Sequence, residues 1–462
     1  MFVILTIMVV QTELTYPEFN PGSGGEPPYL AGRATEQKAL LRPLERLRKG
    51  KGYGSDIIVV GPRGNGKTAL LRWFEGHCEE EDDLDVVWLT PDEFQSVDDL
   101  TGLLAPREGW KKFLPDGVEF TPLGLGNLKW QLGGETRMLT HLLTERCSKG
   151  EEGKPLVVLL DEAHTLDLEF GRVLLNTSQK VRAKAPFLLV LAGTPGLEQR
   201  LGDMGATFWT RSERLGIGRL DAAGSRKAII EPFATHRIQV DEDIVRKVVI
   251  DSQGYPHFLQ CWGQALTERL REAEAGDNPV RRIDSSLLEQ ARPKFLQMQL
   301  DHYEDARRQI KEAGLQSLAA AVTRAAQAGT GALTEGRLNA VIQSYLYSAG
   351  KLPPGPIEQG QSITAFQNDL AATGYIWKPP IAVAMAEAGV DDPEHVTYTW
   401  LAGIPSLMTH VLQKEEELKA EAVRKDWLAP TESSGSGEPP TPTPVAPLHD
   451  LQEELDRDRN ER

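Results

Sequence analysis

The chain has 462 residues, of which 40% are hydrophobic and 26% are charged, a composition typical of a soluble globular protein with several domains. Its formal net charge of −16 gives no overall attraction for polyphosphates, so nucleic-acid binding would need a local basic patch or an oligomeric ring. The three cysteines are far apart and form no C-x-x-C pair. This argues against a zinc site or a disulfide framework, and for a reducing, cytoplasmic compartment.

The N-terminal segment MFVILTIMVV is apolar, but it has about half the length of a membrane span and lacks a basic flank and a cleavage site. A strand, a frayed end or a true start at Met8 is favoured over a membrane anchor. Pro and Gly are frequent over 17–33, so residues 1–33 are predicted as an irregular lead-in. Apolar side chains at helical spacing then predict a helix over 34–49.

Short apolar runs alternate with helical stretches between residues 55 and 220. Runs of this kind, bounded by turn residues, are typical of parallel strands that are covered on both faces. The pattern predicts an α/β fold with a parallel sheet over 34–222. The predicted strands are 56–60, 85–89, 156–160 and 187–192. Residues 92–135 interrupt the alternation and are predicted to contain a glycine-broken hairpin.

The segment GPRGNGKT (61–68) matches the phosphate-loop pattern G-x-x-x-x-G-K-[ST], also called Walker A, between a predicted strand and a predicted helix. Its backbone N–H groups would wrap phosphates at a helix N-terminus. Lys67 would reach the β- and γ-phosphates, and the Thr68 hydroxyl would ligate Mg²⁺. The residues expected to bind the nucleotide are Gly61, Pro62, Arg63, Gly64, Asn65, Gly66, Lys67, Thr68 and Ala69.

A second motif, the Walker B acidic pair, follows the apolar run at 156–160. A carboxylate at the C-terminal end of a buried parallel strand faces the phosphate loop, so Asp161 is predicted to hold Mg²⁺ together with Thr68. Glu162 is placed to orient and deprotonate the water that attacks the γ-phosphate. For His164, a structural role is weighed equally with a catalytic one.

The letters DEAH at 161–164 also spell the name of a helicase family, but the rest of the chain argues against a helicase. The sequence after residue 220 reads as helical, which leaves no second α/β domain, and no Q-x-x-G-R-x-G-R motif occurs. A GTPase is argued against by the absence of N-K-x-D and of the glycine in D-x-x-G. ATP is therefore the expected nucleotide by elimination.

The second half of the chain reads mostly as helices. Residues 223–300 are predicted as a helical lid. Three helical stretches, two candidate strands and a further helix over 301–415 suggest a winged-helix-like domain. Residues 416–462, which are charged and rich in Pro, are predicted to be a disordered tail.

Taken in order, the two motifs above and the segments LAGTPGLEQRL, FWTRSERLGIGRLD and SQGYPHFLQCWGQAL resemble the AAA+ superfamily of P-loop ATPases. The chain is most similar to the origin-recognition/initiator-like ATPases and to the STAND and transposition-associated ATPases, over residues 30–300. The resemblance implies that ATP lies between the sheet domain and the lid, and that ATP drives assembly into a homo-oligomer.

The resemblance also implies roles for residues beyond the two motifs. Thr194 stands at the sensor-1 position, where many members have Asn, and would contact the γ-phosphate or the attacking water. Arg214, preferred over Arg211, stands where the family keeps the arginine finger that completes a neighbouring subunit's site. A surface ion pair with Glu213 or Glu198 is the alternative for this arginine.

In the lid, GYP (254–256) matches the G-x-P of STAND proteins, in which the proline, here Pro256, abuts the nucleotide. His257 then stands near the position of the initiators' second-sensor arginine. With an intrinsic pKa near 6.5, a histidine would be charged only part of the time at neutral pH. Histidine in place of this arginine suggests slow ATP turnover or a nucleotide-state switch. The alternative for His257 is that it only caps or packs its helix.

The third helix of the winged-helix-like domain, predicted over 362–374, contains no Lys or Arg. Gln367 and Asn368 could read adenine edges in duplex DNA, but phosphate attraction is missing. A partner protein or an oligomer contact is therefore favoured over DNA for this domain. The overall expectation is an ATPase whose nucleotide state controls assembly and partner binding. The alternatives are a STAND-like switch with slow hydrolysis and an accessory ATPase of transposition or defence.

Overall fold

The computed structural model describes residues 15–22, 24–51, 55–80, 83–104, 132–148, 154–205, 211–274, 281–328, 333–379 and 399–428. The chain divides into two compact units, Met1–Glu415 and Glu416–Arg462, and the sheet and the candidate site belong to the first. Within the described ranges, no helix combines the length and the apolar composition that crossing a membrane requires.

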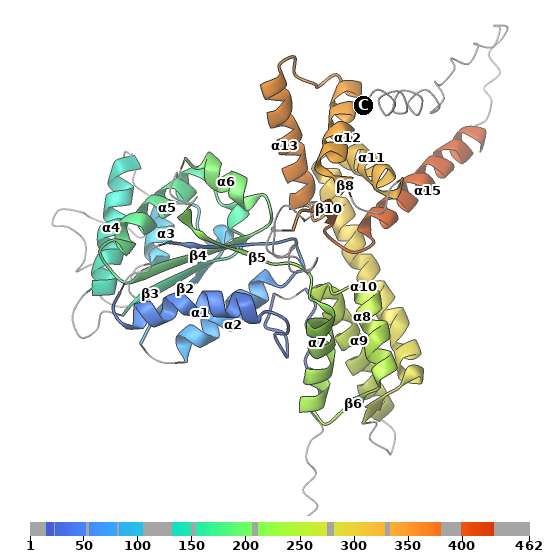
Figure 1. The fold of residues 1–462 in the computed structure, drawn as a ribbon, viewed down its shortest axis with the longest axis horizontal. Helices are drawn as coiled ribbons and strands as arrows, with labels where there is room; N and C mark the ends of the chain where they lie inside the picture. The colour runs from blue at the N-terminus through green and yellow to red at the C-terminus, as the bar shows by residue number, and fades with distance from the viewer. Residues whose placement is uncertain are drawn as a thin grey trace, which may run out of the picture. The chain divides into compact units, whose positions relative to one another are not determined.

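The first unit contains a five-stranded parallel sheet with the strand order β2-β3-β4-β1-β5 (Figure 1). Its strands are β1 (Ile57–Val60), β2 (Asp85–Leu89), β3 (Leu156–Leu160), β4 (Phe187–Gly193) and β5 (Glu213–Gly216). All residues of β3 and β4 are buried, which explains their continuous apolar sequences. The four predicted strands and the α/β class are confirmed. β5 was not predicted because its sequence, ERLG, is half polar and lies at the partly exposed sheet edge.

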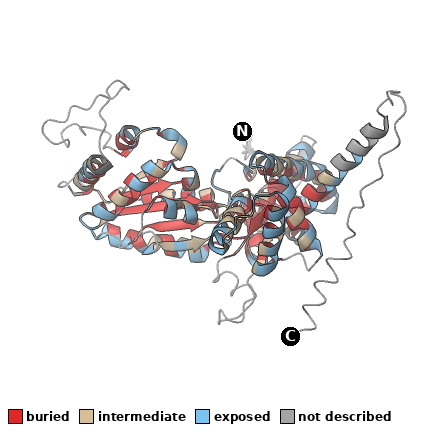
Figure 2. Cartoon of the chain, turned by 90° about the horizontal axis from the view of Figure 1, so that it is seen from above, coloured by how far each residue is buried: buried red, intermediate tan, exposed pale blue. Residues whose placement is uncertain are grey.

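Helices cover both faces of the sheet, and Figure 2 shows the buried strands between helices whose outer sides are exposed. These helices are α1 (Ala34–Arg48), α2 (Lys67–Glu79), α3 (Val97–Leu104), α4 (Leu132–Ser148), α5 (Leu168–Arg182) and α6 (Leu197–Asp203). Successive side chains of a strand point to opposite faces. Val157 of β3 therefore packs in the core beneath α1 and α2, and Val158 packs in the core beneath α3 to α6.

The hairpin predicted within the interrupting segment 92–135 lies mostly outside the described ranges, and the described parts of that segment are largely helical. Pro91–Glu93 forms a short 3-10 helix, α3 follows, and residues 132–135 belong to α4. Val97, Leu100 and Leu104 share a buried face of α3, a helical spacing that the glycines further along the segment obscured. Residues 105–131 lie outside the described ranges.

A helical lid follows the sheet, as predicted. Its helices are α7 (Ala222–Thr235), α8 (Glu242–Ser252), α9 (Pro256–Glu274) and α10 (Ser285–Glu312), with a small parallel pair β6 (Gln239–Val240) and β7 (Arg282–Ile283). Trp262 of α9 stacks on Phe295 of α10, with 4.2 Å between the ring centroids. The predicted boundary at 300/301 falls inside α10, so one continuous helix links the lid to the C-terminal domain.

The C-terminal domain has three helices, a small antiparallel sheet of order β8-β10-β9 and a further helix, and only β8, between the first two helices, was not predicted from the sequence. Its elements are α11 (Gln316–Gln327), β8 (Leu333–Thr334), α12 (Glu335–Ser348), α13 (Pro356–Ala372), β9 (Ile376–Trp377), β10 (Thr399–Ala402) and α15 (Leu407–Leu428). Because α15 continues to Leu428, the expectation of disorder from residue 416 is wrong for 416–428. Residues 429–462 lie outside the described ranges.

A buried ion pair fastens α5 to the start of β1. Arg182 Nη1 lies 2.8 Å from Asp56 Oδ1, and the Ser178 hydroxyl donates to the same oxygen at 2.5 Å. Burial raises the pKa of Asp56, while Arg182 and Ser178 oppose this rise. The buried carboxylate of Asp56 therefore depends on Arg182 and Ser178 to remain charged.

We expect Asp56→Ala to lower the free energy of unfolding by about 3 kcal/mol, because removing one partner of a buried ion pair is strongly destabilising. The matched control is Asp83→Ala, which removes a partly exposed pair with Arg48 (2.9 Å) and should cost less than about 1 kcal/mol. Urea unfolding followed by circular dichroism measures both. Equal losses in the two variants would contradict the expectation.

Candidate functional site

The loop at Gly61–Thr68 joins the end of β1 to the start of α2. The Gly61 N–H donates to the carbonyl of Gly193 at 3.3 Å, so the loop begins against the end of β4. Gly64 and Gly66 have φ of +77° and +85°, a left-handed conformation that favours glycine. The loop thus presents the N-terminus of α2, where backbone N–H groups favour an anion.

The structure brings together the three residues predicted to hold the phosphates and the metal. Lys67 is 6% exposed, and its Nζ donates to the carbonyl of Pro62 at 3.1 Å. The Thr68 hydroxyl donates to Asp161 Oδ2 at 2.6 Å. Burial lowers the pKa of Lys67, although Glu162 and Asp161 oppose the change. Burial also raises the pKa of Asp161, although the Thr68 hydrogen bond opposes it.

The Thr68 and Asp161 oxygens fit a magnesium ion. Mg²⁺ prefers oxygen ligands and commonly uses one or two protein carboxylates together with substrate phosphates. The described residues contain no cluster of three or more His, Cys, Asp or Glu side chains that could hold a metal without a substrate. The pKa of Asp161, raised by burial, marks a carboxylate whose charged form a cation would stabilise.

Beyond Asp161, the chain turns sharply and places three polar groups side by side. Glu162 has φ of +50°, and its carboxylate reaches within 3.3 Å of His164 Nδ1. The backbone N–H of Thr194 donates to the same ring nitrogen at 3.5 Å. Burial, followed by the charge of Lys67, lowers the pKa of His164 to about 4. The ring is therefore neutral near pH 7, and its contact with Glu162 is not an ion pair at that pH.

Thr194 follows β4, at the end of the sheet that faces the loop. Its hydroxyl is buried and has no hydrogen-bond partner among the described residues. A buried hydroxyl without a partner is costly, so a ligand that bonds to it would be favoured. A contact between Thr194 and the γ-phosphate or the attacking water stays a prediction.

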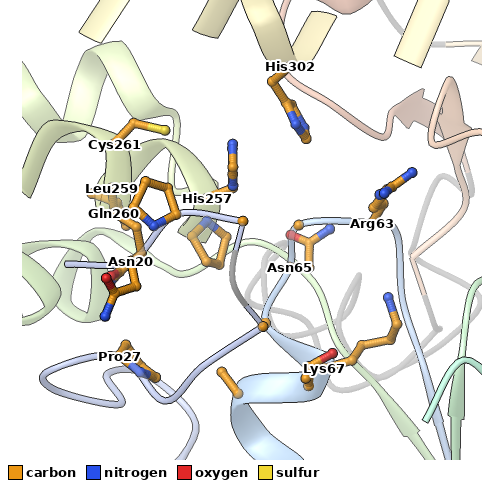
Figure 3. A pocket seen from close by; sticks show the side chains of 18 of the residues that line it. Asn20, Pro27, Arg63, Asn65, Lys67, His257, Leu259, Gln260, Cys261 and His302 are labelled. Atoms are coloured by element: carbon orange, nitrogen blue, oxygen red, sulfur yellow. The ribbon is translucent and has the colours of Figure 1, made fainter. Parts of the chain in front are cut away.

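A cavity of about 530 Å³ opens beside the phosphate loop (Figure 3). It is bounded by the loop, by the lead-in segment, by α9 and by α10, with Thr373 and Ile404 of the C-terminal domain at its border. Pro256 and His257, predicted from the lid motif, both line it, as does Glu162. The lead-in, read only as irregular, thus supplies one wall of the cavity.

The lid contacts the phosphate loop directly through Tyr255 and His257. The buried Tyr255 hydroxyl donates to the carbonyl of Arg63 at 2.7 Å, and the His257 N–H donates to the carbonyl of Gly64 at 3.2 Å. A Cβ at Gly64 would overlap the Tyr255 hydroxyl. Gly64 is therefore required both by its conformation and by the approach of the lid.

Two histidines stack at the lid side of the cavity. The rings of His257 and His302 have centroids 4.2 Å apart, and Tyr255 Oη lies 3.0 Å from His302 Nε2. Burial lowers the pKa of His257 to about 4 and that of His302 to about 3. The expectation that His257 is charged part of the time at neutral pH is therefore wrong, because the fold buries it.

Sequence reasoning missed Arg33, Tyr255 and His302. Arg33 is buried, and its Nη2 donates to the carbonyls of Asn65 at 3.0 Å and Gly218 at 2.5 Å. It thus ties the phosphate loop to the segment that enters the lid. Arg33 ends the lead-in predicted as irregular, which gave no signal for a site residue, and nothing in the spacing of His302 gave one either.

The predicted finger arginines do not line the cavity of their own chain. Arg214 lies on β5, is 44% exposed, and its Nε is 3.4 Å from Glu198 Oε1. This is one of the two ion pairs foreseen as its alternative. Arg211 is also exposed. A role in a neighbouring subunit's site stays a prediction for either residue.

The two residues expected to read adenine are engaged within the chain. Gln367 is buried, and its amide donates to Glu335 at 2.7 Å and to Asn339 at 2.6 Å. The Asn368 amide donates to Gln199 of α6, in the sheet domain. In this structure, neither amide is available to bases in a major groove.

We expect Gly64→Ala to destabilise the protein by about 1–3 kcal/mol, the range for backbone strain of this kind, and to weaken nucleotide binding. Gly76→Ala is the matched control, because Gly76 lies within α2 with nothing near its missing Cβ. It should be neutral or stabilise by up to about 1 kcal/mol. Thermal unfolding measures both.

Adding Tyr255→Phe to Gly64→Ala removes the overlapping hydroxyl and should recover part of the lost stability. If Gly64→Ala unfolds at the same temperature as the unmodified protein, the proposed contact between lid and loop is wrong.

Comparisons with known proteins match one family model and several solved structures. A family model described as an AAA ATPase domain matches residues 29–190. No curated protein matches the chain. Among solved structures, the Walker-type ATPase of Pyrococcus abyssi is 18% identical, with 82% of this chain and 95% of that chain covered and a TM-score of 0.47.

Two further solved structures are similar to the chain at comparable levels. Cdc6p of Pyrobaculum aerophilum is 15% identical, with 86% and 97% of the two chains covered and a TM-score of 0.40. The Aeropyrum pernix ORC1 protein, solved in complex with DNA, is 14% identical, with 86% and 95% covered and a TM-score of 0.41. At these scores, likeness to a solved structure does not assign an activity to this chain.

Proposed function

Because residues 29–190 of the chain are an AAA ATPase domain, which makes the chain a P-loop ATPase, we propose that it binds ATP with Mg²⁺ and hydrolyses it to ADP and phosphate. The observation that carries this proposal is the 2.6 Å hydrogen bond between Thr68 and Asp161 beneath the loop. It joins the end of β3 to the start of α2 at the point where a triphosphate and a cation would meet.

The loop residues have distinct tasks in binding. The backbone N–H groups around Gly64 and Gly66 would hold the phosphates, and Lys67 would place its ammonium against the β- and γ-phosphates. Thr68 and Asp161 would hold the magnesium ion. When bound, that ion supplies charge neutralisation of the phosphate oxygens.

Glu162 and Thr194 would act on the hydrolytic step. Glu162 orients a water toward the γ-phosphorus and takes its proton as the new P–O bond forms and the bond to the ADP oxygen breaks. Its half-exposed position at the border of the cavity leaves room for that water. The Thr194 hydroxyl would donate to the γ-phosphate or to the attacking water.

Assembly into a homo-oligomer would complete the site. Arg214, exposed on β5, would reach the γ-phosphate of a neighbouring subunit once it leaves Glu198. For the C-terminal domain, the engaged amides of Gln367 and Asn368 favour a partner protein or an oligomer contact over duplex DNA. We therefore propose that nucleotide state controls assembly and partner binding.

A STAND-like switch with slow hydrolysis is the second candidate. Among the described residues, the lid presents no Lys or Arg to the cavity, its two histidines there are neutral at pH 7, and it is joined to the loop through Tyr255. A lid that adds no positive charge and closes tightly would hold a nucleotide longer than it would speed its cleavage. Tightly co-purifying ADP, with slow turnover that duplex DNA does not change, would favour this candidate.

We expect Glu162→Gln to bind ATP normally and to lose turnover by about 10²–10⁴-fold, because the amide cannot accept the proton of the attacking water. Phosphate release and ATP titration calorimetry measure the two quantities. Glu169→Gln, at an exposed position in the first turn of α5, is the control and should behave like the unmodified protein. Turnover retained in Glu162→Gln would remove Glu162 from the mechanism.

A finger in trans makes turnover per subunit rise with protein concentration. We expect Arg214→Ala to bind ATP and to abolish this rise, with a loss on the order of 10³-fold at saturation. Arg42→Ala is the control. Arg42 is an exposed residue of α1 that lies 3.6 Å from Glu213, the neighbour of Arg214 on β5. If Arg214→Ala turns over ATP at the normal rate, the finger assignment is wrong.

A further inference from the structure

The charges around the cavity do not all remain available to a ligand. Among the described residues that line it, the cationic side chains are Arg33, Arg63 and Lys67. Arg33 already donates to two carbonyls, one in the phosphate loop and one in the segment entering the lid. A triphosphate would thus meet Lys67 and Arg63 as its side-chain cations.

The lid adds no positive charge to this set. Its two histidines are partly buried, stack on each other and lie against Phe258, and this burial keeps both neutral at pH 7. A triphosphate carries one more phosphate than a diphosphate, so its terminal group needs a cation that the shorter ligand does not use. Without Arg63, Lys67 would be left as the one side-chain cation, among the described residues of the cavity, to meet both the β- and the γ-phosphate.

Arg63 is held in place by its backbone while its side chain remains free to reach a ligand. The Tyr255 hydroxyl bonds to its carbonyl, and the next residue, Gly64, is wedged against the same tyrosine. The side chain itself is exposed and lines the cavity. Figure 3 shows Arg63 and Lys67 on the loop side of the pocket and His302 on the facing side.

The guanidinium of Arg63 also lies within electrostatic range of the reacting end of the site. Its charge contributes to lowering the pKa of Lys67 and of His164, and His164 contacts both Glu162 and Thr194. The terminal phosphate must lie between these groups if Lys67 and Thr194 are both to touch it. Arg63 therefore lies on the same cavity as that position and within electrostatic range of it.

No carboxylate of the cavity holds the Arg63 side chain elsewhere. Asp301 accepts from Gln297 at 2.8 Å, and Asp305 accepts from Arg308 at 2.7 Å. Within the described ranges, the Arg63 guanidinium forms no ion pair or hydrogen bond. A charged and exposed guanidinium on a phosphate loop is suited to binding a pair of phosphate oxygens.

We propose that the Arg63 side chain binds the terminal phosphate of ATP in its own subunit and so makes the site prefer ATP to ADP. This inference rests on the proposed ATPase function and specifies which side chain distinguishes the two nucleotides. It assigns to the phosphate loop a discrimination that the uncharged lid does not supply.

The test uses the full chain carrying Glu162→Gln, so that ATP stays intact during titration. Calorimetry with Mg·ATP and with Mg·ADP is compared between this parent and the same protein with Arg63→Ala. We expect ATP affinity to fall at least about tenfold, as for loss of a charge-assisted hydrogen bond, while ADP affinity changes less than about twofold. Arg63→Lys should retain part of the preference for ATP, because lysine keeps the positive charge but lacks the paired N–H donors with which a guanidinium binds two phosphate oxygens.

Arg226→Ala is the control for loss of a positive charge, since Arg226 pairs with Glu242 on the outside of the lid and does not line the cavity. It should leave both affinities unchanged. If Arg63→Ala weakens the binding of ATP and ADP equally, or weakens neither, the role assigned to Arg63 is wrong, while the proposed ATPase function still stands. A parent that binds neither nucleotide would overturn the proposed function and this inference together.

Discussion

The hydrogen bond from the buried Tyr255 hydroxyl to the carbonyl of Arg63 is the contact on which the arrangement of the site depends. It joins the residue that precedes α9 of the lid to the phosphate loop, and it requires glycine at position 64, because any Cβ there would overlap the hydroxyl. The N–H of His257 makes a second such connection, to the carbonyl of Gly64, the next residue of the loop. Any movement of the lid must therefore break backbone contacts of the loop that would hold the phosphates. This is the physical reason why nucleotide state and lid position should change together in this chain.

The electrostatics of the site point to a ligand that is both anionic and accompanied by a cation. Burial shifts the pKa of Lys67 downward and that of Asp161 upward, so both groups are held in a place that disfavours their charged forms. Phosphates would stabilise the ammonium, and a metal ion would stabilise the carboxylate. The buried Thr194 hydroxyl adds a donor without a partner among the described residues. The protein thus keeps polar groups prepared for a ligand at some cost in stability, as functional sites commonly do.

The C-terminal domain is connected to the ATPase site more closely than its separate sequence pattern suggested. One helix, α10, runs from the lid into it and places His302 in the cavity. Asn368 of α13 bonds to Gln199 of α6, which follows Thr194 in the chain, and the Arg219 guanidinium donates to the carbonyl of Ala402 at 2.7 Å. Through these contacts, a change at the nucleotide could reach the surface of α13. A partner that competes for that surface would sense the nucleotide state.

Local patterns in the sequence were enough to predict the buried strands and the phosphate loop of this protein. Continuous apolar runs indicated the buried strands, and the glycine spacing with Lys67 and Thr68 indicated a phosphate loop whose chemistry needs those residues at those positions. It could not indicate β5, the helix α3 or the continuation of α15, where tertiary packing outweighs a weak local signal. Only the tertiary structure decided that Arg33, Tyr255 and His302, far apart in the chain, meet at one loop. It also decided that His257 is neutral and that Gln367 is buried, because burial and the identity of neighbours are properties of the fold and not of the spacing along the chain.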